Sequence, residues 1–207
     1  DAKITVNGKE IELSALLEKW TAPLEKVFPT KAEVPEIEVD VPLYSERNTS
    51  SPAIKVAKPT VFIPVFPGTN CEVDTARAFE KAGANVEMLI VKNLSSNDIE
   101  ETIDEMEKLI AKSQMIMLPG GFSGGDEPDG SGKFIATTFR NPRIAEQVNN
   151  LLKNRDGLML GICNGFQALI KLGLVPYGEI TGQKEDSPTL TFNTINRHIS
   201  KMVYTKV

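Results

Sequence analysis

The chain contains few of the residues from which metal centres and disulfide frameworks are built. Its 207 residues include one histidine and two cysteines, which is too few for a zinc ligand set. The two cysteines, Cys71 and Cys163, are widely separated and do not make a disulfide framework. Free thiols are typical of a reducing compartment, so we expect a cytoplasmic protein without a bound metal.

Long apolar runs and an excess of positive charge are also missing. No apolar run approaches the roughly 20 residues that a membrane-spanning helix needs, and no signal-peptide pattern is visible. The formal net charge is −5, whereas a nucleic-acid-binding surface needs clustered positive charge. The sequence therefore predicts neither a membrane nor a nucleic acid as a partner.

From residue 59 onward, short apolar runs alternate with segments of helical periodicity. The apolar runs, each predicted as a buried strand, are 61–66, 85–91, 115–118 and 157–160. The predicted helices are 72–82 with Asn70 as N-cap, a second from Ser95 or Ser96 to Ala111, and one or two within 133–153, where Asn141-Pro142 is a start signal. This order predicts an α/β fold with a mostly parallel sheet covered by helices on both faces. In such folds the site lies at the carboxyl ends of the strands.

The residues before this alternation follow a different pattern. Asn7-Gly8 is a strong signal for a tight hairpin turn, and Ser14 is expected to cap the helix that follows it. Pro23 is able to kink or split that helix. Five of the thirteen prolines then fall between residues 29 and 59, as in an extended linker.

Three parts of the chain are thus expected. They are a small hairpin–helix appendage at 1–28, a proline-rich linker at 29–58 and a larger α/β domain at 59–207. The first residue is Asp rather than Met, and Val207 ends an unfinished apolar alternation. We therefore expect a fragment of a longer polypeptide, whose last domain is truncated at its C-terminus. Processing or tag removal is an alternative explanation of the first residue.

A cysteine stands at a predicted junction between a strand and a helix. The strand is 157–160, and the helix ends at Gly173. Gly161 and Gly165 bracket Cys163 in the Gly-x-Nuc-x-Gly pattern, in which small neighbours make room for a nucleophile on a strained turn. A thiol placed there lies at a helix N-terminus, where the dipole favours the thiolate.

Two other interpretations of the cysteines stay open. A free cysteine is most often a small buried core residue, and Cys163 could be one. Cys71 also begins a predicted helix and is a rival nucleophile. It lacks the glycine-bracketed turn, so we expect it to be a packed loop residue near the site.

The stretch Gly161–Gln167 closely resembles the nucleophile turn of class I glutamine amidotransferases. The stretches Pro67–Glu72 and Gly121–Asp126 resemble, more narrowly, the glutaminase domains of phosphoribosylformylglycinamidine synthases, the amidotransferases of purine biosynthesis. The likeness covers roughly residues 59–207 and implies a class I amidotransferase, flavodoxin-like fold. The residues before it look like the end of the synthetase part in the large single-chain form of these enzymes.

The resemblance implies a role for six residues. The nucleophile is Cys163, the oxyanion hole is made by Gly120 or Gly121 and the N–H of Asn164, and Phe122 and Gln167 bind substrate. A structural alternative for Gln167 is a surface or capping residue. The implied reaction is hydrolysis of glutamine through a thioester, which releases ammonia.

The resemblance also implies partners outside this fragment. The synthetase domain of the same polypeptide would use the ammonia, ATP and Mg²⁺ to convert formylglycinamide ribonucleotide into its amidine, a C–N bond-forming ligase reaction. No Gly-x-x-x-x-Gly-Lys-Ser/Thr sequence occurs here. We therefore expect no cofactor in the fragment, with ATP and Mg²⁺ bound by the synthetase part.

The general base of the resembling enzymes has no match in this chain. They carry His-x-Glu after the cysteine, whereas the only histidine here, His198, is followed by Ser200 at the Glu position. We expect His198 to be a surface or structural residue before a strand at 199–204, and the isolated chain to be inactive as a glutaminase.

Two alternative functions stay open at this point. One is another elbow-cysteine hydrolase, of the peptidase or small-aldehyde hydrolase kind, which would need its own histidine close after the cysteine. The other is a catalytically inert interaction module that has kept the fold. A His-x-Glu in a longer coding sequence would favour the amidotransferase over both.

Overall fold

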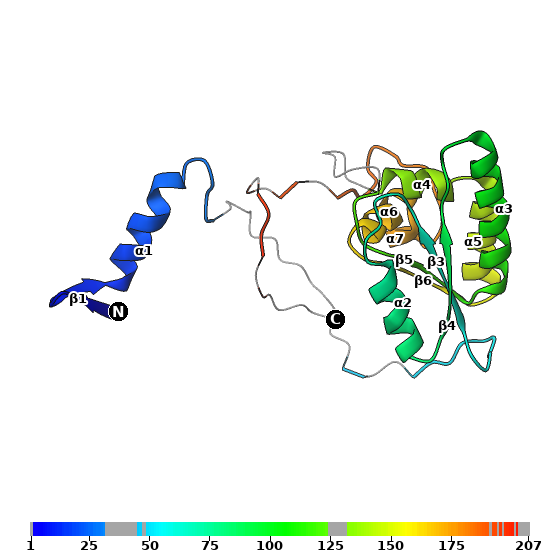
Figure 1. Cartoon of the computed structure of the whole chain (residues 1–207), viewed down its shortest axis with the longest axis horizontal. Coiled ribbons are helices and arrows are strands. Elements are labelled where there is room, and N and C mark those ends of the chain that lie inside the picture. The colour runs from blue at the N-terminus through cyan, green and yellow to red at the C-terminus, as the bar shows by residue number, and fades with distance from the viewer. Residues whose placement is uncertain are drawn as a thin grey trace. The chain divides into compact units, whose positions relative to one another are not determined.

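The computed structural model describes residues 2–31, 45–46, 49–123, 132–190, 192–193, 195, 197–200 and 202. The chain divides into two units (Figure 1). One is Thr49–Thr191, and the other consists of Asp1–Asn48 and Phe192–Val207; each is described separately. Much of the expected linker at 29–58 and of the expected strand at 199–204 lies outside the described residues.

The larger unit is built on a four-stranded parallel sheet. Its strands are β3 (Thr60–Val65), β4 (Asn85–Ile90), β5 (Met115–Leu118) and β6 (Leu158–Gly161). The four predicted strands are therefore confirmed, each to within one residue. Their spatial order, β4-β3-β5-β6, is the order of the first four strands in a flavodoxin-like sheet. The chain reverses its direction across the sheet between β3 and β5, and ligands bind beyond the carboxyl ends of strands at such a switch point.

Six helices lie around this sheet in the described residues. They are α2 (Glu72–Lys81), α3 (Ser96–Lys112), α4 (Lys133–Phe139), α5 (Pro142–Asn154), α6 (Asn164–Leu172) and α7 (Leu174–Tyr177). Alternate strand residues point to opposite faces, so Phe62 and Val61 belong to different cores. The predicted α/β fold, with helices on both faces of a parallel sheet, is confirmed.

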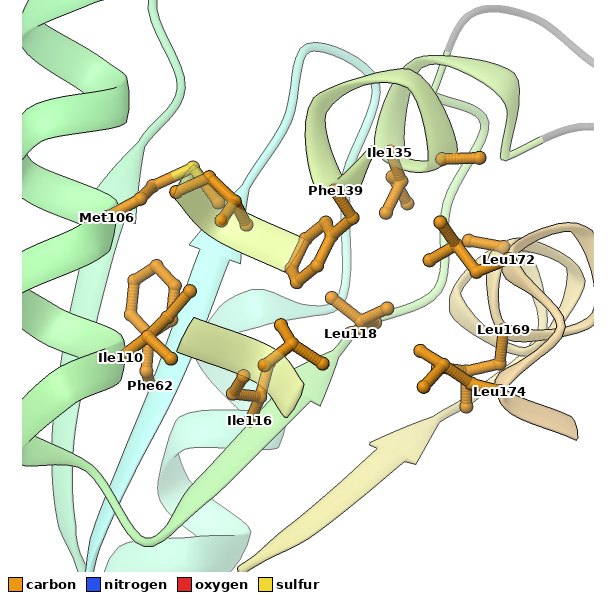
Figure 2. Close-up of a cluster of buried hydrophobic side chains, with 14 of the residues drawn as sticks. Phe62, Met106, Ile110, Ile116, Leu118, Ile135, Phe139, Leu169, Leu172 and Leu174 are labelled. Atoms are coloured by element: carbon orange, nitrogen blue, oxygen red, sulfur yellow. The ribbon is translucent and has the colours of Figure 1, made fainter. Parts of the chain in front are cut away.

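The two faces are covered unequally. On one face, side chains of β3 and β5 pack against α3, α4, α5 and α6; Figure 2 labels Phe62, Met106, Ile110, Ile116, Leu118, Ile135, Phe139, Leu169, Leu172 and Leu174 of this core. On the other face, a smaller core forms between the sheet and α2; its buried members are Val61, Ile63, Ala76 and Met117. The large core holds α4 and α6 against the end of β5. These two helices lie beside the turn between β6 and α6 that carries Cys163, which is called the cysteine turn.

Side-chain caps fix the starts of α3 and α5, at Ser95, one of the two starts expected for α3, and at the expected start signal Asn141-Pro142. The Ser95 hydroxyl accepts a hydrogen bond from the Asp98 N–H at 3.1 Å, and the Asn141 side chain accepts one from Arg143 N–H at 3.0 Å. The prediction that Asn70 caps α2 is wrong. The cap residue is Cys71, and the Asn70 side-chain oxygen instead accepts a hydrogen bond from the Cys71 thiol at 3.1 Å.

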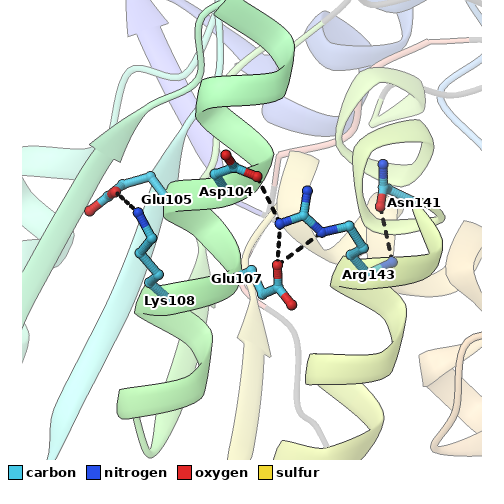
Figure 3. Close-up of polar contacts among 6 residues, drawn as sticks. All are labelled: Asp104, Glu105, Glu107, Lys108, Asn141 and Arg143. Carbon is cyan, nitrogen blue, oxygen red and sulfur yellow. Dashed lines mark hydrogen bonds and ion pairs between the residues drawn. The ribbon is translucent and has the colours of Figure 1, made fainter.

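Polar contacts fasten α3 to α5 on the outer surface (Figure 3). Arg143 of α5 pairs with Asp104 at 2.7 Å and donates from Nε to Glu107 at 2.9 Å. Hydrogen bonds to Asp104 and then to Glu107 raise the pKa of Arg143. At the end of α5, Arg155 donates to the carbonyls of Ile110, Ala111 and Ser113, while burial lowers its pKa. These contacts fix the point from which the chain enters β6.

The smaller unit begins with the expected hairpin. Strands β1 (Lys3–Val6) and β2 (Lys9–Glu12) pair around Asn7 and Gly8, both at positive φ as a tight type I′ turn requires. The prediction that Ser14 caps the next helix is wrong: α1 (Leu13–Thr21) begins directly at the end of β2, with Glu12 at the cap position.

A short 3₁₀ helix follows α1 and contains the proline that was expected to kink or split the helix. This element, η1 (Ala22–Leu24), carries Pro23, which cannot donate the hydrogen bond that would continue α1. Trp20, on α1, is 81% exposed. No helix in the described part of the chain is both long enough and apolar enough to cross a membrane.

Candidate functional site

The turn between β6 and α6 places Cys163 in a strained backbone conformation. Its φ is 53° and its ψ is −108°, a region that residues with a side chain seldom occupy. Cys163 is the N-cap residue of α6, so the first free N–H groups of the helix lie beside its side chain. The thiol is exposed. A free thiol is thus held out of the core at a helix N-terminus.

Gly161 and Gly165 are required on either side of this turn because backbone lies against them. A Cβ added to Gly165 would lie 2.0 Å from the carbonyl oxygen of Leu118, at the end of β5. A Cβ added to Gly161 would lie 2.6 Å from the carbonyl oxygen of Gly165 itself. The start of α6 therefore packs directly on the ends of β5 and β6, with no space for a side chain.

A second loop leaves the neighbouring strand β5 and runs alongside the loop after β3. Gly121 forms an antiparallel bridge with Thr69 and has a φ of 137°, which favours glycine. The Phe122 N–H donates to Gly68 at 2.8 Å, and the Asn70 N–H donates to Gly120 at 3.4 Å. In this pairing pattern the N–H of the bridged residue points away from its partner strand. The Gly121 N–H is therefore directed away from the loop after β3, and β6 adjoins β5 on that side.

Gly120 lies between the two cysteines. A Cβ built on Gly120 would be 3.5 Å from Cys163 Cβ and 3.6 Å from Cys71 Sγ. The structure therefore brings together Cys163 after β6, Gly120 after β5 and the rival thiol Cys71 after β3. The segment 120–123 after β5 is called the glycine loop. Cys71 is exposed, like Cys163.

A buried hydrogen-bond network joins the two loops. Ser123, fully buried, donates from its hydroxyl at 2.5 Å and from its backbone N–H at 3.3 Å to the side-chain oxygen of Asn164. The Asn164 side chain, only 1% exposed, donates in turn to the side-chain oxygen of Gln167 at 3.3 Å. Sequence reasoning named Asn164 and Gln167 but missed Ser123. A serine two residues after the Gly-Gly pair was the available signal.

Two backbone donors stay unpaired, one in the loop after β5 and one at the start of α6. Among the described residues, neither the Gly121 N–H nor the Asn164 N–H has a hydrogen-bond partner. Unpaired N–H groups at a helix start and at a glycine loop are suited to bind a developing oxyanion. The arrangement is chemically able to place a thiolate and two donors around one carbonyl group.

Residues 58–207 match the family model of the CobB/CobQ-like glutamine amidotransferase domain. The chain belongs to this family.

Two curated relatives of this amidotransferase domain carry the same name. The chain is 37% identical over 141 residues to phosphoribosylformylglycinamidine synthase subunit PurQ from Dehalococcoides mccartyi, and the match covers 68% of this chain and 49% of the relative. It is also 37% identical over 153 residues to a subunit of that name from Methanococcus maripaludis, covering 74% of this chain and 51% of the relative. The chain thus spans about half the length of these relatives. They are subunits, so they do not confirm the expected large single-chain origin.

One solved structure, PurLQS from Thermotoga maritima, also matches. It shares 31% identity over 56% of this chain and 45% of its own, with a TM-score of 0.38, which is too low to support a fold assignment.

The remaining predicted residues of this amidotransferase domain fall in two places. Phe122 is 55% exposed on the glycine loop, whereas Gln167 lies one turn after Cys163 and its backbone N–H donates to the Cys163 carbonyl at 3.0 Å. His198 belongs to the smaller unit and is exposed. In the described ranges, no cluster of three or more His, Cys, Asp or Glu residues could hold a metal ion.

Proposed function

We propose that this chain supplies the glutaminase chemistry of a phosphoribosylformylglycinamidine synthase, with Cys163 as the nucleophile. The thiolate attacks the side-chain carbonyl carbon of glutamine and forms a tetrahedral intermediate. Collapse of the intermediate breaks the C–N bond, leaves a glutamyl thioester on Cys163 and releases ammonia once the nitrogen has taken up a proton. Water then cleaves the thioester to glutamate and restores the thiol.

One observation carries this proposal. Cys163 lies in a strained turn at the start of α6, with the unpaired N–H groups of Asn164 and Gly121 belonging to the two loops beside it. We assign these two groups to the oxyanion hole, and we prefer Gly121 over Gly120 because the bridge to Thr69 directs its N–H away from the loop after β3. Loss of one such donor costs about 10²–10³-fold in turnover.

Substrate binding is assigned to the exposed ring of Phe122 and to the side chain of Gln167. Phe122 lies on the same loop as the proposed oxyanion donor, and Gln167 lies on the first turn of α6 after Cys163. An amide side chain is suited to recognise the amino-acid part of glutamine because it can both donate and accept hydrogen bonds.

The use of the ammonia is also part of the proposal. Relatives bear the name phosphoribosylformylglycinamidine synthase subunit PurQ, and this chain covers about half of their length. We infer that a synthetase partner, either on a longer single chain or as a separate subunit, binds ATP and Mg²⁺. That partner transfers the ammonia to formylglycinamide ribonucleotide, as a C–N ligase of purine biosynthesis does.

The proton transfers set a limit on what the 207 residues do alone. A thiolate cannot protonate the leaving ammonia or activate the water that cleaves the thioester. The single histidine, His198, belongs to the other unit and has no carboxylate in a His-x-Glu pattern. Loss of the base in triad enzymes costs on the order of 10⁴–10⁶-fold in turnover. We therefore expect almost no release of glutamate from glutamine, with no further loss in a His198→Ala variant.

An electrophilic glutamine analogue tests the assignment of function. The chain is treated with a γ-diazoketone analogue of glutamine, with and without excess glutamine, and in parallel with iodoacetamide. We expect the analogue to modify Cys163, glutamine to slow the modification, and alanine as competitor to leave the rate unchanged. Labelling that glutamine fails to slow would favour another elbow-cysteine hydrolase, and an unreactive Cys163 would favour an inert module.

A further inference from the structure

Ser123 connects the two loops that carry the proposed oxyanion donors. It lies two residues after Gly121, and both of its hydrogen bonds go to Asn164, the residue that follows Cys163. The bonds link the ends of β5 and β6, which are neighbouring strands. All the atoms concerned are buried, Ser123 being fully covered and Asn164 1% exposed. A buried bond of this kind is costly to leave unmade, so it fixes the two loops relative to each other.

The network also determines which way each amide side chain faces. The backbone N–H of Ser123 can only donate, so the atom of Asn164 that faces it must be the oxygen. The NH₂ group of Asn164 therefore faces Gln167, whose oxygen must accept. Ser123 thus sets the orientation of the Asn164 side-chain amide and, through it, of the Gln167 side-chain amide.

The glycine loop has one attachment on its other side. The bridge between Gly121 and Thr69 ties it to the loop after β3, but this bridge does not involve the cysteine turn. Without the Ser123 hydroxyl, the shorter of the two bonds to Asn164 is lost, and the backbone bond of 3.3 Å is left alone. The Gly121 N–H and the Asn164 N–H would then no longer be held at one separation.

We propose that Ser123 is a positioning residue of the glutaminase reaction, which holds the two oxyanion donors at the separation that the tetrahedral intermediate needs. This inference rests on the proposed function of Cys163. Donor geometry matters most when negative charge develops on the oxygen, so removal of the hydroxyl lowers the rate of acylation more than the affinity for the acyl donor. A misplacement of about 1 Å costs about 10²-fold.

The test uses an acyl donor that needs no general acid. The γ-(4-nitrophenyl) ester of L-glutamate releases nitrophenolate without protonation, so the 207-residue chain can be acylated by it even without a His-x-Glu. The first turnover appears as a burst of nitrophenolate, and a Cys163→Ser variant measures the spontaneous release. Alkylation of Cys163 by iodoacetamide serves as the control, because substitution at a saturated carbon forms no oxyanion.

For Ser123→Ala, we expect the maximal burst rate to fall about 10–100-fold, with the half-saturating ester concentration and the iodoacetamide rate changed less than about two-fold. A Ser123→Thr variant keeps the hydroxyl and should recover part of the rate. Equal burst rates for wild type and Ser123→Ala would overturn the inference, as would a parallel fall of both rates, which indicates general loss of structure. Absence of a burst in the wild type would instead overturn the proposed function.

A double-mutant cycle tests whether Ser123 acts through Asn164. If it does, Ser123→Ala/Asn164→Ala is acylated no more slowly than Asn164→Ala alone, because the second change removes a bond that is already broken. Independent, multiplying effects of the two substitutions would show that Ser123 acts by another route and would overturn the positioning role.

Discussion

Substitution of Gly165 by alanine should displace the cysteine turn from the sheet. The added Cβ would meet the Leu118 carbonyl oxygen at 2.0 Å and the Leu118 carbonyl carbon at 2.7 Å. Both are backbone atoms at the end of β5, so no side-chain rotation relieves the contact. Carbon and oxygen rarely approach closer than about 3.3 Å, and the start of α6 must therefore move by more than about 1 Å.

The magnitude follows from two opposing effects. Inserting a methyl group against fixed backbone costs about 3 kcal/mol, at the upper end of the range for overpacking. Alanine is favoured over glycine within a helix by about 1 kcal/mol, and Gly165 lies in the first turn of α6. The net loss of unfolding free energy is therefore about 2 kcal/mol. Because Cys163 moves with the turn, its acylation by the γ-(4-nitrophenyl) ester should slow about 10²-fold.

Urea unfolding and the nitrophenolate burst measure these two effects. With a slope of about 2 kcal/mol per M, the midpoint should fall by about 1 M. Gly182→Ala is the matched control, because a Cβ at Gly182 meets nothing within 4 Å, and it should change stability by less than about 0.5 kcal/mol. A Gly165→Ala variant as stable and as rapidly acylated as Gly182→Ala would refute the tight contact between α6 and β5.

Three further substitutions test other parts of the structure. In Gly121→Ala the new Cβ would lie 2.4 Å from the Gly68 carbonyl oxygen at a φ of 137°, so the burst rate should fall about 10²–10³-fold; an unchanged rate would exclude a Gly121 donor. Arg155→Met removes the donors that cap the end of α3 and should lower the unfolding free energy by about 1–3 kcal/mol, measured by urea unfolding; a change within error would show that these bonds do not stabilise the protein. The hydrogen bond from Lys153 lowers the pKa of Glu179, so its stabilisation is present above the unfolded value of about 4.3 and is lost as the pH falls through the lower folded value. The difference in urea midpoint between wild type and Glu179→Gln should therefore shrink from about pH 6 to about pH 3, and a difference that grew on acidification would contradict this assignment.

The central strands β3 and β5 were accessible from sequence because burial on both faces leaves continuous apolar runs. The run 115–118 is an example. The adjacent residues Ile116 and Met117 pack into opposite cores, so neither position tolerates a polar residue. The glycines at 161 and 165 were equally informative, because they record backbone contacts with β5 and β6 that no larger residue allows.

Features that depend on tertiary contacts were not predicted. The capping role expected of Asn70 failed for a local reason, because its side chain bonds the thiol of the next residue, Cys71, in competition with capping. The link between Ser123 and Asn164 joins residues 41 apart in the sequence, and the position of Ser123 after the Gly-Gly pair does not indicate which residue it bonds. The bridge between Gly121 and Thr69, which orients the proposed donor, likewise requires the two loops to be placed side by side.

The most direct test of the account is to locate the acyl group after reaction with the γ-(4-nitrophenyl) ester of L-glutamate. The chain is quenched in acid during the burst, digested, and mapped by mass spectrometry, together with Cys163→Ser and Cys71→Ser variants. We predict a glutamyl thioester on Cys163 in the wild type and in Cys71→Ser, and none in Cys163→Ser. A thioester on Cys71, or an acyl group that persists in Cys163→Ser, would contradict the central claim that Cys163 is the nucleophile.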